Sequence, residues 1–150
     1  MEREILSTKQ KALIINLDDT KYGTFAEIGG GQEVARAFFQ AGGASGTIAK
    51  TISAYDKTYS DYYYDSKDKE RYVSEARLKK MLSHEYNEML SILAEKARPD
   101  QRFFVFANTV ETISFKKDNQ GNGRVGRLTM FKECLKYNIV PFIIEDNLKM

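Results

Sequence analysis

Apolar residues recur along the chain with a spacing that predicts three helices. They repeat every three to four positions over residues 32–41, 74–97 and 124–137. Ser74 can cap the second of these helices, and Pro99 follows its expected end, since the residue before a proline avoids the helical conformation. Each helix is therefore expected to bury one face in a core.

Two uninterrupted apolar runs predict buried strands. Residues 11–17 form a short apolar run that ends at Asp18 and Asp19, and residues 103–107 contain four consecutive β-formers. The pattern over residues 48–57 fits either a helix or a strand, and Pro141 argues against a central strand over residues 139–144. We predict an α+β fold in a single compact domain, with two short buried strands and three main helices.

Residues 56–72 are predicted to form a polar loop. Tyrosines are concentrated from Tyr55 to Tyr72, mixed with aspartate, lysine and serine. Tyrosine combines a large contact area with a hydroxyl group, so this loop could serve as an interface. We favour the alternative that it covers part of the core.

Composition excludes several classes of function. The chain has 150 residues, which indicates one ordinary domain. Its formal net charge of +2 provides no strongly basic surface of the kind that binds nucleic acids or anionic membranes. No apolar stretch approaches the roughly 18 to 20 residues needed to cross a bilayer, and no signal peptide is recognisable. Cys134 is the only cysteine, which excludes an internal disulfide. We expect a cytoplasmic protein.

Three glycine-rich stretches are candidates for binding phosphate. Gly29, Gly30 and Gly31 precede the first predicted helix, where free N–H groups could hold an anion, but a plain turn at the start of the helix fits as well. Residues 42–51 end in Lys50 and Thr51, as a phosphate loop does. Three residues separate the last glycine from the lysine, which is the wrong register for such a loop.

The third stretch covers residues 121–127 and leads into the last predicted helix. Gly121, Asn122 and Gly123 free the backbone for an anion-binding turn, and Arg124 and Arg127 lie three residues apart, so both could reach one phosphate. The alternative is a glycine-rich turn with two solvated arginines.

Residues 121–150 resemble the C-terminal part of the Fic domain of bacterial Fic-family adenylyltransferases. The resemblance rests on the Gly-Asn-Gly-Arg sequence, the second arginine and the segments that follow it. It implies an all-helical fold, as the alternative to α+β. It also implies a nucleotide site in which Gly121, Asn122 and Gly123 line the phosphates while Arg124 and Arg127 bind them.

The residues before this loop depart from the Fic pattern. Lys116 stands where the family has its general-base histidine, Asp118 where it has phenylalanine, and Gln120 where it has the carboxylate that holds magnesium. A protonated lysine cannot accept a proton as neutral imidazole does. No catalytic residue and no metal ligand are therefore assigned, and His84 is expected to be a partly exposed surface residue.

The upstream residues, about 10–118, resemble the start of an uncharacterised bacterial family. Its members carry the automatic names nicotinate-nucleotide adenylyltransferase or TonB-dependent receptor, and no functional residue can be transferred from it. The stretches that carry this resemblance are residues 21–36, 49–56, 71–74 and 104–110. We therefore expect a domain over residues 1–118 and a Fic-like helix-loop fragment over 119–150 packed on it, as in a fusion or a truncated protein.

The functional expectation is a non-catalytic domain with a degenerate Fic-like loop that binds phosphate or a nucleotide. The alternative is a Fic-type nucleotidyltransferase, an enzyme of protein adenylylation with a remodelled active site. The first function requires no cofactor, and the second requires ATP with Mg²⁺. The expected partner is a phosphate-bearing small molecule, without nucleic acid or membrane.

Overall fold

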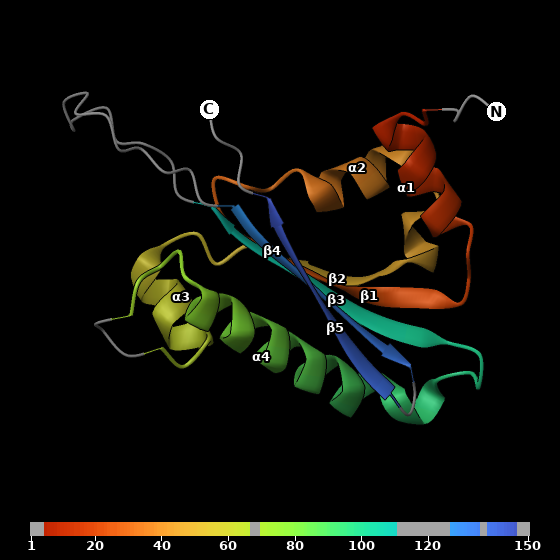
Figure 1. Cartoon of the computed structure of the whole chain (residues 1–150). Helices are drawn as coiled ribbons and strands as arrows, with labels where there is room; N and C mark the ends of the chain where they lie inside the picture. The colour runs from red at the N-terminus through yellow and green to blue at the C-terminus, as the bar shows by residue number, and fades with distance from the viewer. Residues whose placement is uncertain (1–4, 67–69, 111–126, 136–137, 147–150) are drawn as a thin grey trace.

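A five-stranded sheet in the order β2-β1-β3-β4-β5 forms the centre of the molecule (Figure 1). The structure is a computed structural model, which describes residues 5–66, 70–110, 127–135 and 138–146. The elements along the chain are α1 (Thr8–Asn16), β1 (Lys21–Gly29), α2 (Val34–Ala41), β2 (Ile48–Ile52), α3 (Lys57–Tyr63), α4 (Glu75–Leu93), β3 (Arg102–Val110), β4 (Arg127–Leu135) and β5 (Asn138–Asp146). Two short 3-10 turns, Ala44–Gly46 and Ala94–Lys96, follow α2 and α4.

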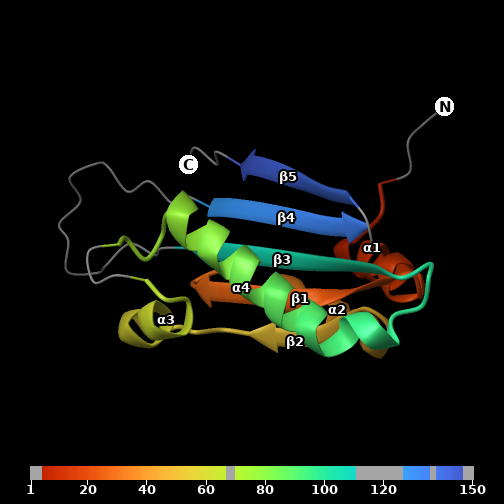
Figure 2. The ribbon, with the colours of Figure 1, turned by 90° about the horizontal axis from the view of Figure 1, so that it is seen from below.

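The first three strands are parallel, and helices connect them. β1 pairs in parallel with β2 on one side and with β3 on the other, whereas β4 and β5 add antiparallel strands. α1 and α2 cover one face of the sheet, and α3 and α4 cover the other (Figures 1 and 2). Parallel strands that are neighbours in a sheet need long crossover connections, and here helices provide them. This alternation of parallel strands and helices defines an α/β fold. The single compact domain is confirmed, and the predicted α+β class and the all-helical alternative are wrong.

Side chains of the parallel strands alternate between two apolar layers. On the α3 and α4 face, β1 and β3 contribute Ala26, Ile28, Phe103, Val105 and Ala107, packed against the buried side of α4. On the α1 and α2 face, Phe25, Phe104 and Phe106 form a smaller cluster with Ala35 of α2. The sheet is therefore covered on both sides, as parallel sheets normally are.

The segment from 11 to 17, predicted as a strand, is helical. Ser7 caps α1 in a reciprocal arrangement with Gln10, so the helix begins upstream of the apolar run. Ile14 remains 58% exposed, and Asn16 is buried because its side-chain amide donates to the carbonyls of Phe38 and Gly42. The apolar run therefore belongs to a helix that packs one face beside α2. A buried strand would instead be covered on both faces.

One strand that the sequence pattern missed is β1. Its polar residues, among them Thr24 and Glu27, interrupt the apolar run that a central strand normally shows, yet all positions from 23 to 29 are buried. Pairing with strands on both sides fixes this segment at the centre of the parallel sheet.

The other local predictions agree with the structure in part. The strand at 103–107 is confirmed within β3, and the helices at 32–41 and 74–97 are confirmed as α2 and α4. The ambiguous segment at 48–57 begins as strand β2. The predicted polar loop at 56–72 is wrong for residues 57–63, which form helix α3 with its first turn capped by Asp56.

The predicted helix at 124–137 is wrong. Residues 127–135 form strand β4, which pairs antiparallel with β3 from Phe103 to Thr109, and β5 pairs with β4 in turn. The open edge of β3 provides backbone hydrogen-bond partners that local spacing does not reveal. Pro141 lies in β5, at the edge of the sheet, where proline is tolerated.

The cap of α4 gives a test of this local structure. Ser74 Oγ accepts a hydrogen bond of 3.1 Å from the Arg77 N–H. Replacing Ser74 by alanine is expected to lower the free energy of unfolding by about 1 kcal/mol, measured by urea denaturation. Ser83→Ala, at an exposed position within the same helix, should change it by less than about 0.5 kcal/mol. Equal losses in both variants would contradict the capping role.

None of the helices in the described part of the chain is long and apolar enough to span a membrane.

Candidate functional site

The glycine-arginine loop predicted to bind phosphate is not among the residues that the structure describes. Gly121, Asn122, Gly123 and Arg124 lie outside the described ranges. Arg127 is the first residue of β4, and its backbone pairs with Asp146 of β5. The phosphate contacts assigned to these residues therefore stay a prediction.

The other glycine-rich candidate, at Gly29, Gly30 and Gly31, forms the turn between β1 and α2. Gly29 has a positive φ of 77°, and the Gly30 N–H donates to the Val110 carbonyl at 2.9 Å. A Cβ atom on Gly29 would overlap that carbonyl oxygen, and one on Gly31 would lie 2.5 Å from Val110 Cγ2. Close approach of the turn to β3 therefore requires glycine at these positions.

The N-terminus of α2 is already occupied by a carboxylate of the protein. Glu27 Oε1 accepts the N–H of Val34 at 3.1 Å, and Oε2 accepts that of Ala35 at 3.0 Å. Asn108 Nδ2 donates to the same Oε1 at 2.9 Å, and Glu27 is only 3% exposed. The positive end of the helix dipole is thus neutralised internally. The glycine turn acts as the start of a helix, and an external phosphate would have to displace Glu27.

A crevice opens beside this cap, at the carboxyl ends of β1 and β2. Its cavity volume is about 380 Å³, and its walls come from β1, the first turns of α2 and the end of β2. The lining residues are Glu27, Gln32, Ala35, Arg36, Phe39, Thr51, Ile52 and Ser53. Five of these eight residues are polar or charged, which distinguishes the set from the apolar layers of the core.

The side chains that line the crevice differ in which of their groups a ligand could contact. Gln32 Nε2 donates to the Gly29 carbonyl at 2.9 Å, so its amide oxygen is the part left for a ligand. Arg36, Thr51 and Ser53 are exposed, and the Phe39 ring is 53% exposed. The crevice therefore offers a cation, two hydroxyl groups and an exposed aromatic side chain.

The opposite face of the sheet carries a buried ionic cluster between α3 and α4. Arg77 is fully buried, and its guanidinium forms an ion pair with Asp61 and a hydrogen bond with Ser60. Lys57 reaches Asp61 from the preceding turn of α3. Burial raises the pKa of Asp61, but hydrogen bonds and charges from Lys57 and Arg77 outweigh it and hold that pKa below its usual value.

A second buried carboxylate, Glu85, links α4 to β2 and α3. Tyr64 donates to Glu85 Oε1 at 2.9 Å, and Lys50 forms ion pairs with Glu85 and Glu88. Burial lowers the pKa of Lys50, but the two glutamates outweigh that effect and raise it above its usual value. Burial and the Glu85 charge raise the pKa of Tyr64, so its hydroxyl stays protonated and remains a donor.

His84 lies beside this second cluster, in contact with two tyrosine rings. Its ring centroid is 4.7 Å from that of Tyr63 and 5.5 Å from that of Tyr64. This partly exposed position agrees with the prediction for His84. It lies on the face of the sheet opposite the crevice, because it belongs to α4 whereas the crevice borders α2. His84 therefore cannot act as a base in the crevice.

Sequence reasoning did not find the crevice or the ionic clusters. The buried charges Glu27, Arg77 and Glu85 look like ordinary polar residues in the sequence, because a single charged residue carries no signal of burial. One signal was available: Arg77 and Glu85 lie on the stripe of α4 that also holds Leu78 and Met81. The described residues include no cluster of three His, Cys, Asp or Glu side chains that could hold a metal ion.

Comparison with solved structures identifies the fold. No protein-family profile matches the sequence, and no curated protein matches it significantly. The crystal structure of the competence/damage inducible protein CihA from Agrobacterium tumefaciens matches with a TM-score of 0.59 over 97% of this chain and 84% of that chain, at 17% identity.

Two further structures give the same result. A competence-damaged protein (CinA) superfamily protein from Enterobacter cloacae matches over 97% of this chain and 82% of its own, with a TM-score of 0.57 and 11% identity. One from Escherichia coli matches over 95% and 81%, with a TM-score of 0.56 and 16% identity.

These matches correct the family and function predicted from the sequence. They cover nearly the whole chain with one α/β fold, including both segments that were assigned to separate families, and they are not Fic domains. The expected degenerate Fic-like nucleotide-binding domain, and the Fic-type adenylyltransferase kept as its alternative, are therefore wrong. The chain has the fold of the CinA superfamily of competence/damage-inducible proteins.

Proposed function

We propose that this protein binds a small polar molecule with an anionic group in the crevice between β1, β2 and α2. The observation that carries the proposal is the group of polar and charged residues at this crevice, which includes the exposed Arg36. In open α/β sheets, ligands bind outside the carboxyl ends of the parallel strands. The crevice lies at that edge.

The lining indicates the chemistry of the ligand. Arg36 can pair with a carboxylate or a phosphate, and the hydroxyl groups of Thr51 and Ser53 can complete its hydrogen bonds. Phe39 is one helical turn from Arg36 on α2, so a planar ring could stack on it while the anionic group reaches the guanidinium. An aromatic or heterocyclic anion fits these three features together.

The proposal is for binding, because the described part of the crevice lacks the groups for acid–base chemistry. Glu27 is the only carboxylate among the described lining residues, and both of its oxygens cap α2. Neither Thr51 nor Ser53 has a histidine beside it, because His84, the single histidine of the chain, lies on the other face of the sheet.

Phenyl phosphate is a suitable probe, with phenol as the uncharged control. Titration into the ¹⁵N-labelled full chain should shift amide resonances of α2 and of residues 51–53 at low millimolar ligand, and phenol should bind at least about fivefold more weakly. Phosphate contacts should make binding weaker at high salt.

The Arg36→Gln variant should weaken binding of phenyl phosphate about five- to tenfold, because the charge-assisted contact is lost. Arg98→Gln is the matched control, since Arg98 is an exposed arginine that pairs with Asp19 away from the crevice. Shifts that map elsewhere, or equal affinities of the Arg36 and Arg98 variants, would refute the proposal.

A further inference from the structure

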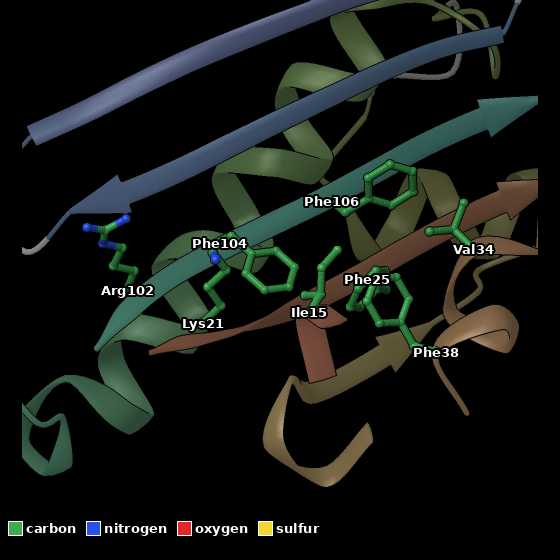
Figure 3. Close-up of a pocket in the computed structure, with 8 residues that line it drawn as sticks. All are labelled: Ile15, Lys21, Phe25, Val34, Phe38, Arg102, Phe104 and Phe106. Atoms are coloured by element: carbon green, nitrogen blue, oxygen red, sulfur yellow. The ribbon is translucent and has the colours of Figure 1, made fainter. Parts of the chain in front are cut away.

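A second cavity, of about 370 Å³, lies between the α1 and α2 layer and the sheet (Figure 3). Its walls come from α1, α2, β1 and β3. The lining residues that the structure describes are Ile15, Lys21, Phe25, Val34, Phe38, Arg102, Phe104 and Phe106. Six of these eight residues are apolar, so this cavity differs in chemistry from the crevice.

Aromatic rings from both layers line this cavity. Phe38 belongs to α2, whereas Phe25, Phe104 and Phe106 belong to the strands. The Phe25 ring lies 5.0 Å from that of Phe38, 5.5 Å from that of Phe104 and 5.8 Å from that of Phe106, measured between centroids. The three strand phenylalanines are buried, so the walls on the sheet side are held in place by the core.

The two charged lining residues are occupied by other groups of the protein. Lys21 forms an ion pair with Asp18, and the hydrogen bonds from Lys21 and Thr20 hold the pKa of Asp18 below its usual value. Arg102 also has an interaction within the protein. An ionic group of a ligand placed among the phenylalanines would therefore lose its hydration without gaining a partner. The cavity is suited to an uncharged molecule.

The size of the cavity indicates the size of that molecule. Protein interiors are normally packed to the density of organic crystals, and an unfilled apolar space lowers stability. An engineered apolar cavity of about 150 Å³ stays dry and binds benzene. The cavity described here is larger, and aromatic walls favour a flat ring as their contact. A hydrocarbon of two fused rings therefore fits its volume and its lining.

We propose that this cavity binds an uncharged, flat apolar molecule of the size class of naphthalene. The ligand rings contact Phe25, Phe38 and Phe104, and binding is favourable because apolar surface leaves water on both sides of the contact. This site is separate from the crevice of the proposed function, because the two sets of lining residues do not overlap. Either site can therefore fail in an experiment without the other.

Naphthalene tests the chemistry of the site, with 2-naphthoate as the charged control that has the same rings. Titration of naphthalene into the ¹⁵N-labelled full chain, up to its solubility limit, should shift the amide resonances of Phe104 and Phe106, which line this cavity and not the crevice. 2-Naphthoate should act on these two resonances with at least about tenfold lower affinity, whereas shifts that it causes at residues 51–53 report on the crevice. No response of Phe104 and Phe106 to naphthalene, or equal affinities of the two compounds there, would overturn the proposal.

Two adjacent isoleucines test the location. Ile15 lines the cavity and Ile14 is 58% exposed, so Ile15→Trp fills the space while Ile14→Trp adds the same bulk outside it. We expect Ile15→Trp to weaken naphthalene binding at least about tenfold and Ile14→Trp to change it less than about twofold. Thermal unfolding checks that both variants fold. Val34→Phe narrows the same space from α2 and replaces Ile15→Trp if that variant does not fold. Wild-type affinity for naphthalene in a folded cavity-filling variant would overturn the proposal.

Discussion

Replacing Arg77 by methionine is expected to lower the free energy of unfolding by about 3–5 kcal/mol, because it leaves the buried carboxylate of Asp61 without its main partner. Methionine keeps much of the apolar stem, so the loss reports on the ion pair more than on packing. Lys57 still reaches Asp61, which favours the lower end of this range. Urea denaturation measures the difference directly.

Lys79→Met is the matched control for this substitution. Lys79 lies two residues further along α4 and is 61% exposed, and its pair with Glu75 is solvent-screened. Its replacement should change the free energy of unfolding by less than about 0.5 kcal/mol. A double variant that also replaces Asp61 by leucine should recover part of the loss, since it removes the unpaired charge. A loss below about 1 kcal/mol in Arg77→Met would contradict the structural role of the pair.

The effect of Arg77→Met should depend on pH. The pKa of Asp61 lies below its usual value in the folded protein, so the ion pair contributes stability above the usual aspartate range of about 3.9. That contribution is lost as the pH falls through the lowered folded pKa. The difference between the wild-type protein and the variant should therefore be full at neutral pH and shrink under acid conditions. A constant difference across this range would argue for packing as its cause.

Replacing Gly29 by alanine is expected to destabilise the protein by about 3 kcal/mol. The residue has a φ of 77°, which costs about 1–2 kcal/mol for an L side chain. The added Cβ would also overlap the backbone carbonyl oxygen of Val110, and relieving that overlap requires the β1–α2 turn to move away from β3. Overpacking of this kind adds about 1–3 kcal/mol.

Gly43→Ala separates these two contributions. Gly43 has a similar φ of 74°, but the nearest atom to its Cβ would be Asn16 Cβ at 3.6 Å, an ordinary contact. The conformational cost alone applies there, so we expect a loss of about 1–2 kcal/mol by urea denaturation. Equal losses for Gly29 and Gly43 would show that the close approach to Val110 does not contribute to stability.

Movement of the turn should also affect the candidate site. Gly29 accepts the side-chain amide of Gln32, which lines the crevice, and the turn holds α2 against the Glu27 cap. Gly29→Ala is therefore expected to weaken binding of phenyl phosphate, while Gly43→Ala leaves it unchanged, as measured by the same NMR titration. This comparison connects the geometry of the turn to the proposed function.

The sequence by itself determined the elements whose signals are local. The apolar stripe and Ser74 defined α4, glycines on both sides defined α2, and consecutive β-formers defined β3. The argument against a central strand over residues 139–144 also came from a local property, the missing N–H of proline. In each case the sequence signal that predicts the element lies within a few residues.

Tertiary structure decided the elements that depend on distant partners. β1 is central because β2 and β3 pair with both of its edges, and residues 127–135 are a strand because β3 offers them an open edge. Helical spacing alone could not reveal that backbone partner. An uninterrupted apolar run misled the assignment of residues 11–17 to a strand; they are helical because Ser7 caps them and α2 packs beside them.

The candidate crevice is a product of the parallel sheet, because β1 and β2 both contribute to its walls. Pairing of β1 with β3 sets Glu27 beside Asn108 at one end and Lys21 beside Arg102 at the other, across about 80 positions of sequence. The sequence supplies these charges, but their meeting depends on hydrogen bonds between strands that local patterns do not encode. Composition and spacing could therefore predict helices and a strand, and only the assembled sheet could bring the binding residues together.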